Sequence, residues 1–205
     1  MKEFFSIDGK VYGALNVMVE LLELNLLVII GCLPIITIGA SVASLYEVVF
    51  QIRSEGAVRV YSRFWKAFRE NLRKGTVLWM IVVSAGAAMV LVYWLISNVT
   101  HGSVVVLIPI CVIIAVLILA AMLIFPIAGR FDMSVQAIIR SALSLSMQHV
   151  LVTALAFVLM LVFVVVIPLF APRLLLLWVL FAFSLTAYLQ SWLLLRVFNQ
   201  HAQAQ

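Results

Sequence analysis

Charged residues are scarce in this sequence. They make up 10% of its 205 residues, whereas hydrophobic residues make up 66%. A soluble domain is about 25% charged and about half apolar. With so few charges the chain cannot cover a water-exposed surface. The composition therefore predicts a single integral membrane domain over residues 1–205 and excludes an ordinary soluble domain.

Cysteine and histidine are too few and too scattered for the sites that depend on them. The two cysteines, Cys32 and Cys111, each lie in an apolar segment, and no CxxC motif occurs. His101, His149 and His201 lie in three different regions, so we expect no metal site. The sequence also contains no HExxH motif, nucleophile elbow or phosphate-binding glycine loop. We therefore predict a protein that is not an enzyme and carries no cofactor.

The sequence contains several long apolar runs without a charged residue. Each run is close to or above the ~20 residues that a helix needs to cross a bilayer. Backbone groups in lipid must bond within their own segment, so these runs are expected to be helices. The predicted fold class is all-α, a polytopic transmembrane helix bundle of five or six spans. The runs are residues 24–46, 76–97, 104–128, 150–170 and 174–195.

The first apolar run has two interpretations. As one kinked span over residues 24–46, it gives five spans and an external N-terminus. As a hairpin, residues 11–33 form one helix and residues 37–53 return as a shorter one, which gives six helices and two internal termini. Pro34 disfavours a continuous helix, and Gly39 follows within a plausible turn. We favour six helices in three hairpins.

Basic residues predict the orientation. Seven of the 13 Lys and Arg residues lie between positions 53 and 74, and cytoplasmic segments carry such an excess. This places the C-terminus in the cytoplasm and, in the six-helix interpretation, the N-terminus as well. The predicted segments are the N-terminal broken span or hairpin at 11–53, a basic amphipathic cytoplasmic helix at 54–74, a second hairpin at 75–128, an amphipathic cytoplasmic helix at 129–149 with Asp132 as its N-cap, and a third hairpin at 150–198.

Four stretches of the chain carry a family resemblance: FFSIDGKVYGALN, LNLLVIIGCLPIITIGASVASLY, FWKAFRENLRKG and AIIRSALSLSMQH. Through them the chain resembles, from Phe4 to about Phe198, the YesL family of bacterial membrane proteins. The resemblance implies a multi-pass protein of the bacterial plasma membrane with no established activity and no catalytic residues to transfer. Family members often occur in gene neighbourhoods for carbohydrate use and ABC-type sugar import. The resemblance therefore implies an accessory role in carbohydrate uptake, with a membrane protein such as a sugar permease as partner.

Polar residues within or beside the apolar segments are the first candidate functional residues, because they are costly in lipid. Glu20 and Glu23 are either functional or simply interfacial, and Glu47 is either functional or paired with Arg53 or another nearby arginine. The asparagine is expected to hydrogen-bond between helices. The broken segment either exposes backbone groups to a ligand or forms a tight turn followed by close helix packing. These candidates are Glu20, Glu23, Asn25, Pro34, Thr37, Gly39, Ser41 and Glu47.

A helix that is basic on one face and aromatic on the other is the second candidate. It is expected either to bind anionic lipid headgroups or to dock a partner protein. Because its charges lie beside a membrane span, the net charge of +5 does not indicate nucleic-acid binding. The sequence also permits a homo-oligomer. The candidate contact residues are Arg59, Arg63, Phe64, Trp65, Lys66, Phe68, Arg69, Arg73 and Lys74.

Two functions remain open from the sequence. The leading hypothesis is a non-enzymatic accessory or assembly factor of a membrane complex. The alternative is a small channel or transporter that uses the broken segment around Pro34 to Gly39 together with Glu47. A continuous polar cavity would favour transport, whereas a tightly packed bundle would favour the accessory role.

Overall fold

The computed structural model describes residues 10–56, 58–99, 104–170, 173 and 175–202. Helices account for nearly all of this part of the chain, and it contains no strand, so the all-α prediction is confirmed. The elements are α1 (Lys10–Cys32), the 3₁₀ turn η1 (Ile35–Thr37), α2 (Ile38–Glu55), α3 (Val60–Val99), α4 (Val104–Arg130), α5 (Val135–Gln148), α6 (Val150–Met160), the π-helical segment η2 (Leu161–Val166), α7 (Ile167–Phe170) and α8 (Leu175–Ala202). The start of the family resemblance, residues 4–9, lies outside the described residues.

The N-terminal apolar region forms a hairpin. α1 ends at Cys32 and α2 begins at Ile38, with η1 between them. The Thr37 hydroxyl donates to the Gly31 carbonyl oxygen at 2.8 Å, which satisfies an acceptor left free in the last turn of α1. The Pro34 carbonyl oxygen, 2.9 Å from the same hydroxyl, accepts from the Thr37 backbone N–H. The described residues contain six stretches that are long and apolar enough to cross a membrane. The structure thus supports six helices rather than five.

The basic segment and the span that follows it form one helix. α3 runs without interruption from Val60 to Val99, about 60 Å at 1.5 Å per residue. The equivalent segment before the third hairpin is a separate helix, because α5 ends at Gln148 and α6 begins at Val150. The two predicted lead-in helices are therefore joined to their hairpins differently.

Asp132 is not the N-cap of α5, contrary to the sequence-based prediction. Ser134 directly precedes the helix and accepts from the Ala137 backbone N–H at 3.4 Å. An N-cap oxygen must reach the N–H of the second or third helical residue, and Ser134 has the right spacing. Asp132 instead accepts a hydrogen bond from Lys74 of α3.

α2 lies at the centre of the fold and contacts α1, α3, α4 and α8. Glycines at its crossings allow the backbones to approach closely. A Cβ atom added to Gly75 would lie 2.6 Å from the Cα atom of Ala40, and one added to Gly39 would overlap the Gly75 carbonyl oxygen. Likewise, a Cβ atom on Gly129 of α4 would overlap the carbonyl oxygen of Ala43. The small residues of α2 are therefore packing residues at two helix crossings.

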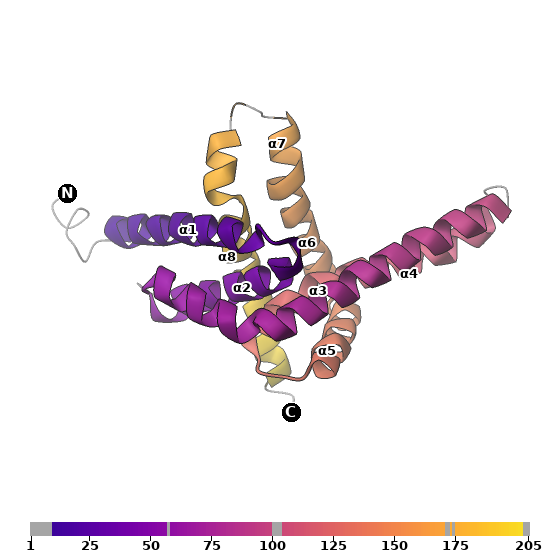
Figure 1. Ribbon diagram of the computed structural model, residues 1–205, viewed down its shortest axis with the longest axis horizontal. Helices are drawn as coiled ribbons and strands as arrows, with labels where there is room; N and C mark the ends of the chain where they lie inside the picture. The colour runs from indigo at the N-terminus through magenta and orange to yellow at the C-terminus, as the bar shows by residue number, and fades with distance from the viewer. Residues whose placement is uncertain (1–9, 57, 100–103, 171–172, 174, 203–205) are drawn as a thin grey trace.

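The second and third hairpins project away from this centre. Figure 1 shows the α3–α4 hairpin and the hairpin of α6, α7 and α8 extending in different directions. Within the described residues α3 contacts neither α6 nor α8. Apolar side chains on the outer parts are consequently exposed, among them Val90 at 70% and Phe170 at 82%. Exposed apolar surfaces of this kind are typical of helices that contact lipid or another membrane protein.

Buried hydrogen bonds attach α8 to the centre. The Tyr46 hydroxyl of α2 donates to the Gln190 side chain, which in turn donates to the Ala156 carbonyl oxygen of α6 at 2.7 Å. Arg53, near the end of α2, donates to the Ser191 hydroxyl at 2.9 Å. These bonds use polar groups that would be costly if left unpaired in a dry interior. They join three helices at one end of the third hairpin.

Candidate functional site

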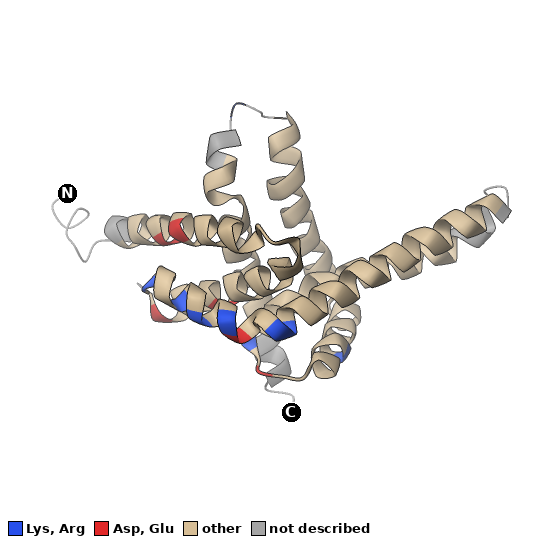
Figure 2. Cartoon of the chain, in the orientation of Figure 1, with Lys and Arg blue, Asp and Glu red and all other residues tan. Residues whose placement is uncertain are grey.

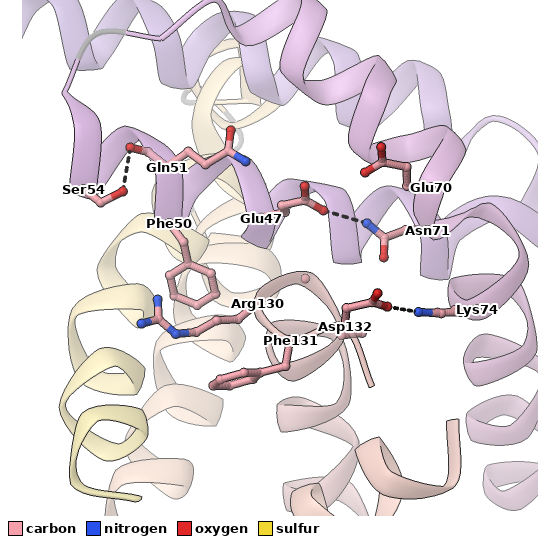
Figure 3. Close-up of a pocket in the computed structure, with 12 residues that line it drawn as sticks. Glu47, Phe50, Gln51, Ser54, Glu70, Asn71, Lys74, Arg130, Phe131 and Asp132 are labelled. Atoms are coloured by element: carbon pink, nitrogen blue, oxygen red, sulfur yellow. Dashed lines mark hydrogen bonds and ion pairs between the residues drawn. The ribbon is translucent and has the colours of Figure 1, made fainter. Parts of the chain in front are cut away.

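Charged residues gather around the N-terminal part of α3. Figure 2 shows them there, in the middle of α1, toward the end of α2, around the end of α4 and on α5, while the described outer parts of both projecting hairpins have almost none. A polar pocket of about 750 Å³ opens between α2, α3, the end of α4 and the loop after it (Figure 3). Its lining residues are Glu47, Phe50, Gln51, Ser54, Glu70, Asn71, Lys74, Ala128, Gly129, Arg130, Phe131 and Asp132.

One wall of the pocket comes from α2 and α3. Glu47, Gln51 and Ser54 follow one another at spacings of four and three, so they share a face of α2. The Asn71 side chain of α3 donates to Glu47 Oε2 at 2.8 Å and to its own helix at the Ala67 carbonyl oxygen at 3.0 Å. Asn71 is only 7% exposed. The Glu47 carboxylate is therefore oriented by a buried amide.

The opposite wall comes from the end of α4 and the loop that follows. The Arg130 guanidinium lies 5.3 Å from the centre of the Phe50 ring and 5.8 Å from that of Phe131. Lys74 crosses from α3 to bind Asp132 (Figure 3). The hydrogen bond from Lys74, assisted by its positive charge, holds the pKa of Asp132 below its ordinary value. The positive charge of Lys74 is therefore neutralised by Asp132 within the pocket.

The residues of the predicted broken segment do not line this pocket. Pro34 is exposed in the turn, and Thr37 bonds locally to carbonyl oxygens. Gly39 is buried at the crossing with α3. Ser41 is fully buried, and a Cβ atom on Gly31 would overlap its hydroxyl, so it lies at the α1–α2 contact. Of the candidates from α2, only Glu47 reaches the pocket.

The candidates from α1 have structural contacts. Glu20 accepts from the Val58 backbone N–H at 2.8 Å, while its Oε2 is buried without a hydrogen-bond partner among the described residues. Glu23 is half-buried. The Asn25 side chain, which is fully buried, donates to the Val179 carbonyl oxygen of α8 at 2.7 Å. The expected hydrogen bonding of Asn25 between helices is thus present.

The basic and aromatic candidates on α3 and directly before it are divided between surface and core. The charged residues Arg59, Arg63, Lys66, Arg69 and Arg73 are exposed. Phe64, in contrast, is fully buried in the hydrophobic core and cannot contact lipid or a partner. Trp65 and Phe68 are half-buried and pack against that core. A second surface pocket, of about 470 Å³, is lined by Tyr61, Ser62, Trp65, Lys66, Arg69 and Glu70.

Several residues of the site and its support were not singled out from the sequence. Asn71 and Arg130 line the pocket, and Gln190 joins α2, α6 and α8. Gln190 had a visible signal, because it is a polar residue inside an apolar run. Asn71 had no such signal, since it lies in a segment that is already rich in charge.

The fold and the pocket define a polytopic all-helical membrane-type protein with a polar pocket at its charged end. Residues 21–93 match the sequence model of a family described as "Protein of unknown function, DUF624". This match extends from α1 through α2 into the outer part of α3 and includes Glu47 and Asn71. Comparison with curated proteins finds no match. Comparison with solved structures likewise finds none.

Proposed function

We propose that the protein is a non-enzymatic accessory or assembly factor that docks another membrane protein along its α3–α4 hairpin. The observation that carries this proposal is a run of small residues, 84–88, in the middle of the outer part of α3. All five are exposed, and a Cβ atom added to Gly86 would meet nothing within 4 Å. Small exposed residues allow a second helix to approach closely within a membrane.

An apolar cavity beside this run supports the same surface. It has a volume of about 330 Å³ and lies between α3, α4 and α5, with Ala85, Gly86, Ala121 and Ile139 among its lining residues. Such a hollow would accept the side chains of a helix packed against the hairpin. Aligned apolar ridges and grooves are how membrane helices associate.

The family resemblance suggests which partner to test first. The match to a family of unknown function is consistent with the YesL family, whose members often occur near genes for carbohydrate use. We therefore propose a bacterial plasma-membrane protein that acts in carbohydrate uptake, with the permease subunit of an ABC-type sugar importer as partner.

A channel or transporter that combines the broken segment with Glu47 has less support. Gly39 and Glu47 are eight positions apart on one helix, about 12 Å. The broken segment is an exposed turn next to a packed crossing, while Glu47 lines the pocket. A single transport site would require the broken segment and Glu47 to face the same cavity.

Photocrosslinking in native membranes tests the proposal. A photoreactive amino acid at Val90, on the open face of α3, should capture a membrane protein that mass spectrometry identifies as a permease subunit. The same probe at Leu151 of α6, which is 86% exposed, is the matched control for contact with bulk lipid. Equal capture at both positions, or capture at neither, contradicts docking at the hairpin.

Substitution at a glycine gives an independent test. Gly86→Leu should abolish co-purification of the partner, because the added side chain separates the helices. Gly13→Leu on α1 is the control, since Gly13 likewise has open space around it. Undiminished co-purification with Gly86→Leu would refute the proposed contact.

A further inference from the structure

The polar pocket between α2, α3 and α4 has the size and lining of a small-molecule site. Its volume of about 750 Å³ lies within the range of ligand pockets in proteins. Most of its lining residues are polar or charged, and the rings of Phe50 and Phe131 form its apolar part. The proposed docking surface lies elsewhere, on the outer part of α3, and makes no use of this pocket.

Two carboxylates on one wall form no ion pair among the described residues. Glu47 is bound by the Asn71 amide and interacts with Lys66 only through its charge, and Glu70 has no ion pair. Lys74 is already paired with Asp132. The lining holds three carboxylates, Glu47, Glu70 and Asp132, against the two cations Lys74 and Arg130, so the pocket carries a small net negative charge.

The buried amide of Asn71 points to a ligand. Both hydrogen bonds that this side chain makes with the described residues use its nitrogen, and its carbonyl oxygen accepts none from them. Figure 3 shows that oxygen turned away from Glu47 and toward the space above Asp132 and Lys74. A residue that is 93% buried, with an acceptor left open to a cavity, is suited to receive a hydrogen-bond donor from a ligand.

The remaining features favour a cation that donates hydrogen bonds. The end of α4, whose last carbonyl groups carry partial negative charge, lines the pocket at Ala128 and Gly129. The rings of Phe50 and Phe131 already meet the Arg130 guanidinium, at 5.3 Å and 5.8 Å, so they are not counted among the groups that hold the ligand. A metal ion is a poorer fit, because the described residues contain no group of three His, Cys, Asp or Glu side chains that could ligate one.

We propose that this pocket binds an organic ammonium group, held by the carboxylates of Glu47 and Glu70 and the amide oxygen of Asn71. A primary ammonium has three N–H donors, and these three acceptors would satisfy them. The group is carried either by the ethanolamine headgroup of a phospholipid or by a soluble amine. Both sources present the same chemistry to the pocket.

Binding to the full-length protein in dodecyl maltoside micelles tests the proposal. In one arm, free ethanolamine is titrated by isothermal calorimetry. In the other, phosphatidylethanolamine is added to the micelles, with phosphatidylglycerol as the headgroup control, and bound lipid is counted by native mass spectrometry. If binding occurs in the first arm alone, the ligand is a soluble amine. If it occurs in the second arm alone, the ligand is a lipid headgroup. Binding in both arms supports the shared chemistry. Binding in neither arm overturns the proposal.

Isosteric variants locate the site. Glu47→Gln and Glu70→Gln should each weaken binding about ten-fold, because each removes one charge-assisted hydrogen bond. Glu55→Gln, which changes an exposed glutamate of α2 outside the pocket, should bind like the unmodified protein. Thermal unfolding without ligand shows whether each variant is folded. Because Glu70 is exposed, Glu70→Gln should disturb folding less than Glu47→Gln. Unchanged affinity in a folded Glu70→Gln variant also overturns the proposal.

Discussion

Asn25 shows how one polar side chain can organise two membrane helices. Its Oδ1 accepts from the backbone N–H groups of Phe183 at 2.9 Å and Ser184 at 3.0 Å, while its Nδ2 donates to the Val179 carbonyl oxygen. Val179 and Phe183 are four residues apart, so the amide lies across one turn of α8. A side chain that bonds to both sides of a helical turn sets the position of α1 along α8.

Replacing Asn25 by Leu should destabilise the protein by about 1–2 kcal/mol. The three hydrogen bonds disappear, and backbone groups of α8 lose their buried partner. Unfolding by a denaturing detergent, followed by circular dichroism, measures the effect. Asn98→Leu is the control, since Asn98 is exposed and bonds only to Trp94 of its own helix. Equal stability of the two variants would show that the Asn25 contact contributes nothing measurable.

Asp132 should titrate below an ordinary aspartate. Because its pKa is lowered in the folded protein, its contribution to stability is present above the unfolded value of ~3.9 and is lost as pH falls through the folded value. The carboxyl is fully exposed, so the effect on stability is expected to be small. Carbon-detected NMR of the side chain across acidic pH measures the pKa directly.

Lys74→Met should return the pKa of Asp132 toward its ordinary value, because the hydrogen bond and the positive charge are both lost. Arg63→Met, which removes a cation that pairs with Glu55 instead, should leave the titration unchanged. An Asp132 titration that does not respond to Lys74→Met would contradict the assignment of this ion pair.

At the scale of elements, the crossings of α2 depend on the absence of side chains. Gly75→Ala should destabilise the protein by at least about 1–3 kcal/mol, because the new Cβ atom would meet the Ala40 backbone at 2.6 Å. Backbone atoms cannot rotate aside as a flexible side chain can. The two helices must therefore separate, which disturbs the most buried helix of the fold.

The matched substitution Gly13→Ala should have the opposite effect and stabilise the protein. Nothing lies within 4 Å of a Cβ atom at Gly13, and alanine is the better helix former by roughly 0.8–1 kcal/mol. Thermal unfolding of both variants under identical conditions makes the comparison. Similar changes at the two glycines would indicate that the α2–α3 crossing is looser than the structure shows.

The third hairpin differs from the others in its local helix geometry. Between α6 and α7 the chain forms a π-helical segment, and the Trp178 indole of α8 donates to the Phe163 carbonyl oxygen within it at 3.0 Å. A π-helical turn changes the backbone bonding pattern and leaves carbonyl groups open to other donors. The indole takes up one of them and joins the two arms of the hairpin.

At the scale of the whole molecule, the separation of charged and apolar regions predicts the orientation. The basic N-terminal part of α3 seen in Figure 2 should face the cytoplasm, and the far end of α3, one span away, should face the opposite side. A fluorescent protein fused after residue 205 should therefore be fluorescent, and an alkaline phosphatase there should be inactive. Phosphatase inserted at residue 98 should be active. The reverse pattern at these two sites would invert the proposed topology.

Much of the architecture follows from the sequence by itself. Uncharged runs of sufficient length must be helices in lipid, because no other local structure bonds its own backbone. Pro34 ends a helix, since it has no N–H to donate and its ring crowds the preceding turn. The basic segment marks one end of the molecule. These are local properties, and the structure has the corresponding helices, turn and charged end.

The candidate site depended on the tertiary structure. Glu47, Asn71 and Arg130 come from three helices, and helical periodicity places a residue on a face without naming the helix that it meets. For the same reason the sequence placed Phe64 at a contact surface and Asp132 at a helix cap. The packing of α2 against α3 and α4 buries Phe64 and brings Asp132 to Lys74. Both contacts depend on distances between segments that are remote in the chain, which the sequence does not contain.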